Sequence, residues 1–184
     1  MQCIILVGPK HSGKTSAGKA LALLLSCSFV DLDDFITQRN GKSPRALYNE
    51  GPEIFRQAEA GALADLLESE MANGASLFVP RGSSLVIASG GGLADNPDAL
   101  SFLKENSVII PVFLDISAGI AWERIRAAGE IPPFLNTENP QETHRSLHER
   151  RAAVYRQLAL HVIMADGKSS QEIAREIIHK LHVH

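Results

Sequence analysis

Residues 3–15 read CIILVGPKHSGKT, and this segment is the most informative about the fold class. The apolar run Cys3–Val7 predicts a buried strand, and the residues after it match the spacing G-x-x-x-x-G-K-[ST], with helical sequence from near Lys14. A glycine-rich turn between a strand and a helix can wrap its backbone N–H groups around a phosphate, next to the positive end of the helix dipole. The stretch therefore predicts a P-loop that binds a nucleoside triphosphate; the alternative is a glycine-rich turn without a ligand.

The residues of this loop have distinct expected roles. Lys14 is expected to reach the β- and γ-phosphates and to take part in catalysis, and the Thr15 hydroxyl is expected to bind Mg²⁺. The expected ATP-binding residues of the loop are His11, Ser12, Gly13, Lys14, Thr15 and Ser16. The motif thus implies ATP and Mg²⁺ as cofactors.

Outward from the P-loop, short apolar runs alternate with helical patterns. Further strands are expected at Leu85–Ala88, Val108–Leu114 and His161–Met164, with a weaker one at Ser28–Leu32. Runs of this kind, closed by Gly, Asp or Pro, are typical of parallel strands that are covered on both faces. We therefore predict a three-layer α/β fold of about five parallel strands flanked by helices, and a single domain over residues 1–184.

Composition and charge restrict the partners. The 18 Lys and Arg residues against 21 Asp and Glu give a net charge of -3, so no overall positive field attracts nucleic acid or an anionic membrane. No apolar stretch approaches the ~20 residues that a membrane helix needs. The two cysteines, Cys3 and Cys27, cannot form a disulfide framework. We expect a cytoplasmic monomer that binds a small molecule, and neither nucleic acid nor a membrane.

Three carboxylates, Asp31, Asp33 and Asp34, follow the expected second strand. In an extended chain Asp31 and Asp33 point to the same side. One of them could hold a Mg²⁺-bound water, while the other accepts a hydrogen bond from a substrate hydroxyl and takes its proton. The alternative is that Asp33 or Asp34 caps a helix that begins near Phe35.

Two weaker signals follow along the chain. Arg56 and Glu59 lie three residues apart near the start of an expected helix, where they could be no more than a surface ion pair. The cluster Gly90, Gly91 and Gly92 follows an expected strand, and it would let the backbone approach a ligand at the carboxyl end of the sheet.

The class of P-loop protein is narrowed by what the sequence lacks. It contains no N-K-x-D tetrapeptide for reading guanine, and 184 residues leave no room for a motor or a transporter. Residues 127–142 contain three prolines and little periodicity, as in a lid that closes over a substrate. These features favour a small-molecule kinase with a lid.

Taken in order, the motifs resemble those of the shikimate kinase family. They are the P-loop, the D-x-D after the second strand, the helix start G-x-x-x-F-R-x-x-E, the triple glycine after the central strand, and the segment Arg151–Tyr155. The resemblance covers about residues 3–175. It implies a P-loop kinase that uses ATP to phosphorylate shikimate, a step of aromatic amino-acid biosynthesis.

The resemblance also implies roles for individual residues. Asp31 is expected to support Mg²⁺ through water, beside Thr15, and Asp33 is expected to bind shikimate and to act as the catalytic base. The further matches are Gly90, Gly91 and Gly92 for the substrate and Arg124 for the adenine side of ATP.

Two arginines match the pair that binds the shikimate carboxylate in this family. They are Arg56, which also counts among the expected catalytic residues, and Arg151, and Glu59 is expected to orient Arg56. A planar guanidinium binds a carboxylate through two parallel hydrogen bonds, which a lysine cannot do.

The lid departs from the family pattern. The family carries R-P-L-L there, whereas Pro132 stands in the arginine's place here, and no Lys or Arg occurs in residues 127–142. An arginine that stabilises the transferring phosphoryl group is worth on the order of 10³–10⁵ in rate where it is used. The candidate replacements are Lys10, Arg124, Arg126, Arg145 and Arg150. Two smaller departures are His11 in a usual glycine position and an insertion at about residues 76–84, interpreted as a surface loop.

Three hypotheses follow from the sequence. The first is transfer of phosphate from ATP to the 3-hydroxyl of shikimate. The second, motivated by the uncharged lid, is a nucleotide-binding or regulatory protein of the same fold with weak or no transfer activity. The third is a kinase of a related hydroxy acid such as gluconate.

Overall fold

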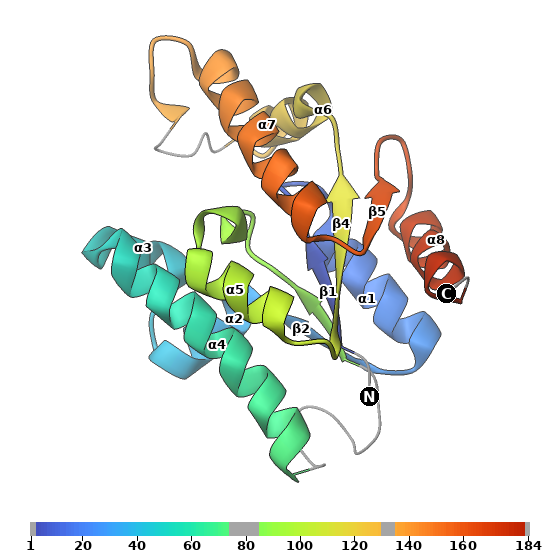
Figure 1. The fold of residues 1–184 in the computed structure, drawn as a ribbon. Coiled ribbons are helices and arrows are strands. Elements are labelled where there is room, and N and C mark those ends of the chain that lie inside the picture. Colours follow the sequence, from blue (N-terminus) through green and yellow to red (C-terminus); the bar gives the residue numbers. More distant parts are fainter. Residues whose placement is uncertain (1–2, 74–84, 130–134, 183–184) are drawn as a thin grey trace.

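The computed structural model describes residues 3–73, 85–129 and 135–182 (Figure 1). The predicted insertion at 76–84 and Pro132 of the predicted lid lie outside these ranges.

Within the described residues, strands and helices alternate along the chain. In order they are β1 (Cys3–Val7), α1 (Lys14–Leu25), β2 (Ser28–Asp31), α2 (Leu32–Asn40), α3 (Pro44–Glu50), α4 (Pro52–Asn73), β3 (Leu85–Ala88), the 3₁₀ helix η1 (Leu93–Asp95), α5 (Pro97–Glu105), β4 (Ile109–Asp115), α6 (Ala118–Ala127), α7 (Pro140–Leu158), β5 (His161–Met164) and α8 (Ser170–His182). None of the helices in these ranges combines the length and apolar character that crossing a bilayer requires.

The five strands form one parallel sheet in the order β2-β3-β1-β4-β5. The central strand β1 pairs with β3 on one side and with β4 on the other, so that Cys3 faces both Leu85 and Ile109. The prediction of five parallel strands is confirmed. Because β1 and β3 are adjacent and parallel, the loops that follow them leave the same edge of the sheet side by side, where open α/β sheets bind ligands.

Two helical layers cover the sheet, as the three-layer prediction requires (Figure 1). Residues of β1 alternate between two cores: Cys3, Ile5 and Val7 pack with α2, α4, α5 and α7, whereas Ile4 and Leu6 pack with α1 and α8. All five of these side chains are buried, because a strand in the middle of a covered sheet has no face toward water. This burial explains why CIILV is continuously apolar rather than alternating.

The junction of β2 and α2 differs from the sequence prediction. The strand ends at Asp31, and α2 begins at Leu32 rather than near Phe35. The N-cap is Asp31, whose side chain accepts a hydrogen bond from the backbone N–H of Asp33, so the proposed caps Asp33 and Asp34 are wrong. Asp33 therefore lies in the first helical turn, and the argument from an extended chain does not describe its orientation.

The carboxyl-terminal end of the predicted lid range is helical. Helix α7 begins at Pro140, where the side chain of Asn139 caps it by accepting a hydrogen bond from the N–H of Glu142. The last three residues of the predicted range 127–142 are thus helical. Residues 118–129 and 135–148, which we call the lid arm, rise beyond the edge of the sheet (Figure 1).

The lid arm is held together by an aromatic stack. The Trp122 ring on α6 lies 5.5 Å from the His144 ring on α7, which lies 5.6 Å from that of His148. Ring nitrogen Nε2 of His148 lies 2.8 Å from the carbonyl oxygen of Ile116, at the end of β4. This stack fixes the base of the arm against the sheet edge that carries the P-loop.

Candidate active site

A cavity of about 320 Å³ opens at the carboxyl ends of β1, β2 and β3. Its lining comes from the P-loop, the β2–α2 junction and the loop after β3: Lys10, His11, Gly13, Lys14, Thr15, Ser16, Asp31, Asp33, Ser89, Gly90 and Gly91. One wall is thus cationic and rich in N–H groups, and the opposite wall carries carboxylates. Such a cavity can hold a phosphate chain on one side and a hydroxyl donor on the other.

The P-loop holds its lysine inside the loop. The Nζ of Lys14 donates hydrogen bonds to the carbonyl oxygens of Gly8 and Pro9, both at 2.9 Å, and lies 3.4 Å from the Ser12 hydroxyl. Burial lowers the pKa of Lys14 to about 8, although the negative charges of Asp33 and Asp31 act in the opposite direction. The lysine is thus already positioned and partly desolvated before an anionic ligand arrives.

The loop depends on backbone conformations that favour glycine. Gly13, the N-cap of α1, has a φ of 91°, and His11 has a φ of 65° in the left-handed region. The family's usual glycine at the His11 position fits that conformation, so histidine is accommodated here at some cost in strain. The carbonyl oxygen of His11 accepts a hydrogen bond of 2.8 Å from Arg124 on α6.

A threonine and an aspartate meet beside the P-loop. The Thr15 hydroxyl donates a hydrogen bond of 2.8 Å to Asp31 Oδ2, while Oδ1 of the same carboxylate caps α2. Hydroxyl and carboxylate oxygens are the ligands that Mg²⁺ prefers. The predicted metal residues Thr15 and Asp31 are therefore brought together, and their chemistry fits the ion.

Asp33 faces the same cavity from the first turn of α2. Its carboxyl pKa is raised, first by burial and then by the neighbouring charge of Asp31. A Cβ placed on Gly90 would lie 3.0 Å from Oδ1 of Asp33, so the glycine keeps the space in front of this carboxylate open. An aspartate with a raised pKa at a cavity wall suits a group that accepts a proton.

Gly91 brings the loop after β3 against the P-loop. A Cβ on Gly91 would lie only 2.7 Å from the backbone nitrogen of Lys10, a distance that side chains do not tolerate. The Gly91 carbonyl accepts hydrogen bonds of 3.2 Å from the Tyr155 hydroxyl and from Arg151 Nη1. Gly91 thus links three separate parts of the sequence.

Arg151 on α7 is oriented by the 3₁₀ helix η1. Its Nε and Nη2 donate to Asp95 Oδ2 at 3.0 and 2.7 Å, and Arg150 also pairs with Asp95, at 2.8 Å. The Arg151 side chain is only 17% exposed. The bonds to Asp95 and to the Gly91 carbonyl together use three of the five N–H groups of the Arg151 guanidinium. Two N–H groups therefore remain for a ligand.

Arg56 is not oriented as the sequence predicted. Its Nη1 pairs with Glu53 at 3.2 Å, one turn back on α4, and not with Glu59. The carboxylate of Glu59 is 1% exposed and accepts a hydrogen bond of 2.9 Å from Asn96, which also donates to the Arg56 carbonyl. Burial raises the pKa of Glu59 to about 7, against the effect of the Asn96 hydrogen bond.

A second cavity, of about 210 Å³, continues from the other side of the P-loop. Its lining includes Ser12, Gly13 and Ser16 of the P-loop together with Arg124 and Lys168. This arrangement is the one expected if Arg124 faces the adenine side of ATP. The side chain of Lys168 pairs with Glu176 on α8.

The structure brings together part of the predicted site. Lys14, Thr15, Asp31, Asp33, Gly90 and Gly91 line the first cavity, as do His11, Gly13 and Ser16 of the loop, while Ser12 and Arg124 line the second. Arg56, Gly92 and Arg151 do not line the first cavity, although Arg151 contacts its wall through Gly91.

Several residues of the site were missed by the sequence reasoning. Asp95 orients Arg151, Asn96 binds Glu59 and the Arg56 carbonyl, and Tyr155 binds the glycine loop, all through hydrogen bonds between distant parts of the chain. Asn96 precedes Pro97 at the start of α5 and caps it, so the Asn-Pro pair could have located the helix start but not the contact with Glu59.

Known proteins similar to this chain share its length and its fold. A family model described as shikimate kinase matches residues 10–182. A shikimate kinase of Shewanella oneidensis is 31% identical over 179 residues, covering 97% of this chain and 95% of that protein. The solved structure of a shikimate kinase from Acinetobacter baumannii in complex with shikimate has a TM-score of 0.80 at 29% identity, covering 100% of this chain and 94% of that one.

A more distant likeness concerns the fold alone. A gluconokinase structure from Sinorhizobium meliloti has a TM-score of 0.59 at 18% identity and covers 99% of this chain and 92% of that one.

Proposed function

The chain belongs to the shikimate kinase family, and on that premise we propose that it transfers the γ-phosphoryl group of ATP to the 3-hydroxyl of shikimate. The observation that carries the proposal is a single cavity that joins Lys14 and Thr15 of the P-loop to the carboxylate of Asp33. The products are ADP and shikimate 3-phosphate.

In this reaction the hydroxyl oxygen forms a bond to the γ-phosphorus while the bond to the bridging oxygen of ADP breaks. Asp33 hydrogen-bonds the attacking hydroxyl and accepts its proton, which its raised pKa favours. Lys14 leaves the loop carbonyls and binds the β- and γ-phosphate oxygens. The remaining contribution of the cavity is to hold the two substrates in line, because phosphoryl transfer depends mainly on positioning and charge.

We propose Mg²⁺ as the companion of ATP. Thr15 and Asp31, joined by a hydrogen bond of 2.8 Å, would hold the ion directly and through water respectively. When bound, the ion neutralises charge on the phosphate oxygens.

The carboxylate of shikimate would bind between Arg56 and Arg151. Both guanidiniums are engaged by carboxylates of the protein, at Glu53 and Asp95, and Arg151 keeps two N–H groups for a further partner. Gly90 would let a ring hydroxyl approach Asp33 without a side chain in the way, and Gly91 and Gly92 would contact the ring through their backbone. These assignments rest on the family's motifs together with the chemistry of each group.

A coupled assay of ADP release tests the proposed function. Purified protein with ATP and Mg²⁺ is expected to release ADP rapidly only when shikimate is added. Gluconate and quinate in the same assay test the third hypothesis, and either of them as the faster substrate would replace shikimate in the proposal. Shikimate-dependent turnover no faster than background hydrolysis would contradict it.

The second hypothesis, weak or absent transfer, is motivated by the lack of any Lys or Arg in residues 127–142. Calorimetry separates it from the first, because it predicts that ATP and shikimate bind while the assay stays silent. We propose in addition that the protein acts as a monomer in the cytoplasm; sedimentation at micromolar concentration tests the monomer.

A further inference from the structure

The charge of the transferring phosphoryl group needs a cation that the lid of this chain does not contain. No Lys or Arg occurs in residues 127–142, where Glu138 and Glu142 add negative charge. Negative charge accumulates on the phosphoryl oxygens and the leaving oxygen during transfer, and a positioned cation stabilises it more strongly there than in water. The structure therefore has to supply this charge from elsewhere.

Three of the four arginines near the arm are already engaged. Arg124 donates to the His11 carbonyl and lies in the second cavity. Arg145 pairs with Glu142 and Glu149, and Arg150 pairs with Asp95, so the positive charge of each is largely offset. The fourth, Arg126, is exposed near the end of α6.

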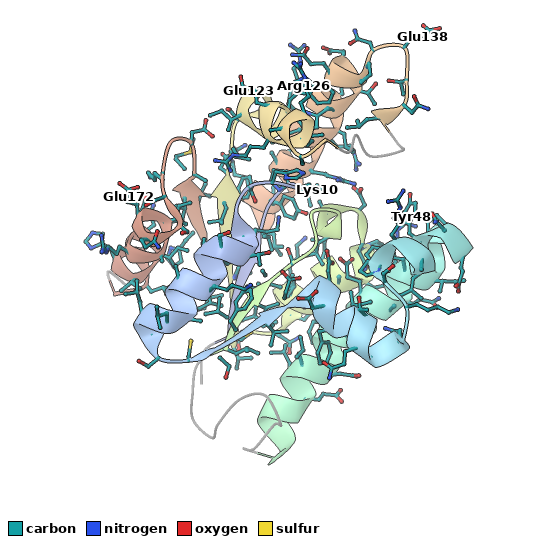
Figure 2. All side chains as sticks on the ribbon, turned by 180° about the vertical axis from the view of Figure 1, so that it is seen from behind. Lys10, Tyr48, Glu123, Arg126, Glu138 and Glu172 are labelled. Carbon is teal, nitrogen blue, oxygen red and sulfur yellow. The ribbon has the colours of Figure 1, made fainter. Side chains whose placement is uncertain are left out.

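Lys10 differs from these arginines in position and surroundings. It lines the first cavity together with Lys14 and Asp33, and no ion pair of its ammonium occurs in the part of the chain that the structure describes. Figure 2 shows Lys10 where the lid arm meets the core, with Arg126 farther out on the arm. Its side chain is exposed, so the ammonium can reorient toward a ligand in the cavity.

The backbone of Lys10 is held in place by the loop after β3. The Cα of Gly91 approaches so closely that a Cβ there would lie 2.7 Å from the Lys10 nitrogen and 3.0 Å from its Cα. Lys10 therefore sits at the boundary between the P-loop, which holds the phosphates, and the glycine loop beside Asp33. A phosphoryl group passing from one to the other crosses this boundary.

Both lysines of the P-loop line the first cavity. Lys14 reaches the cavity from inside the loop, whereas Lys10 reaches it from the outer turn.

We propose that Lys10 is a catalytic residue that binds the γ-phosphoryl oxygens during transfer and replaces the missing cation of the lid. The inference rests on the proposed function. The bond changes are those given above: the substrate oxygen bonds to phosphorus, the bridging oxygen leaves with ADP, and the hydroxyl proton goes to Asp33. Lys10 exchanges no proton in this step and contributes charge alone.

The test compares K10A, K10R and R126A in the steady-state assay with saturating ATP and shikimate, and R126A examines the remaining candidate cation of the arm. The expected kcat of K10A is lower by on the order of 10²-fold, because a cation aimed at the transition state is lost. K10R keeps the charge and should recover most of the rate. R126A should stay within about twofold of wild type, since Arg126 is exposed and lines neither of the two cavities described above, so truncating it costs little transition-state binding.

A second measurement separates a role in transfer from a role in folding or in ATP binding. ADP alone is a ground-state ligand of the protein. The complex of ADP with Mg²⁺, aluminium fluoride and shikimate imitates the transition state, in which the phosphoryl group is transferred. K10A should bind ADP within about threefold of wild type but lose on the order of 10²-fold in affinity for the fluoride complex.

Three outcomes would contradict the proposed role of Lys10. Wild-type protein without shikimate-dependent turnover overturns the proposed function and this role with it. An active wild type with an equally active K10A, or equal losses of affinity for ADP and for the fluoride complex, overturns the role of Lys10 alone. If R126A lowers kcat strongly and K10A lowers it only slightly, the cation that stabilises the transferring phosphoryl group is Arg126 of the lid arm, and the role of Lys10 is overturned.

Discussion

At the scale of single residues, Glu59 is a carboxylate in an unusual position. It is 1% exposed, and its Oε1 has no hydrogen-bond partner among the described residues, while Oε2 accepts from Asn96. A Cβ on Gly90 would lie 3.3 Å from Oε1, so this oxygen faces the glycine loop. Ionising such a group costs free energy, which explains why its pKa is raised to about 7.

The raised pKa of Glu59 predicts a pH-dependent stability. The folded-state pKa of about 7 lies above the ordinary glutamate value of 4.5, so the stability that the protonated Glu59 contributes is complete below pH 4.5 and is lost as the pH rises through 7. The free energy of unfolding of wild type relative to E59Q should fall by about 3 kcal/mol between pH 4.5 and 8.

Urea unfolding of both proteins across this range measures the difference. The exposed neighbour Glu53 gives the matched control, and E53Q should run parallel to wild type. A difference between wild type and E59Q that does not change with pH would show that Glu59 is ionised throughout.

The two adjacent arginines of α7 allow a matched comparison. Arg151 and Arg150 both pair with Asp95, but Arg151 is 17% exposed and bonded to the cavity wall at Gly91, whereas Arg150 is 57% exposed. R151A should raise the KM for shikimate by roughly 10-fold or more with little change in that for ATP, because a charge-assisted pair is worth about 1.5–3 kcal/mol.

R150A should leave both KM values within about twofold, since exposed ion pairs contribute little. Initial rates over a matrix of shikimate and ATP concentrations give both constants. Equal increases in the KM for shikimate and the KM for ATP in R151A would show that this arginine does not bind the shikimate carboxylate.

At the scale of elements, the contact between the P-loop and the loop after β3 positions the site. G91A would place a Cβ 2.7 Å from the Lys10 backbone, so one of the two loops must shift. We expect a stability loss of about 1–3 kcal/mol, typical of overpacking, together with weaker ADP binding.

The control is G119A in α6, where a Cβ meets nothing within 4 Å. Alanine in an open helical position should raise stability by up to about 1 kcal/mol and leave ADP affinity unchanged. Thermal unfolding and calorimetry measure both quantities. G91A with wild-type ADP affinity would mean that the two loops are not coupled.

Strands that are buried on both faces could be predicted from the sequence. The strands Cys3–Val7, Leu85–Ala88 and His161–Met164 agree with the structure at both ends, because burial on both faces makes each run continuously apolar. The predicted start of α2 near Phe35 was wrong, because Asp31 both ends strand β2 and caps the helix. No turn residues therefore mark the boundary in the sequence.

The start of α7 was missed for a different reason. Pro140 was counted as a loop residue, although a proline in the first turn after a capping asparagine is typical of a helix start. Residues 140–142 of the predicted range 127–142 therefore belong to α7.

At the scale of the whole molecule, the site is assembled from parts that only the topology brings together. The P-loop residues could be assigned from a local motif, because strand, loop and helix are consecutive. The pairing of Arg56 with Glu59 was wrong because Asn96, from an element 37 residues away, occupies Glu59 instead. Local spacing on a helix contains no information about such a competitor.

In the proposed complex, two arginines from α4 and α7 bind one carboxylate while a hydroxyl of the same molecule meets Asp33. A crystal structure with ADP and shikimate tests this most directly. We expect the shikimate carboxylate to lie within about 3.2 Å of a nitrogen of both Arg56 and Arg151, with a ring hydroxyl at Asp33. Shikimate bound elsewhere, with Arg56 and Arg151 paired only with Glu53 and Asp95, would contradict it.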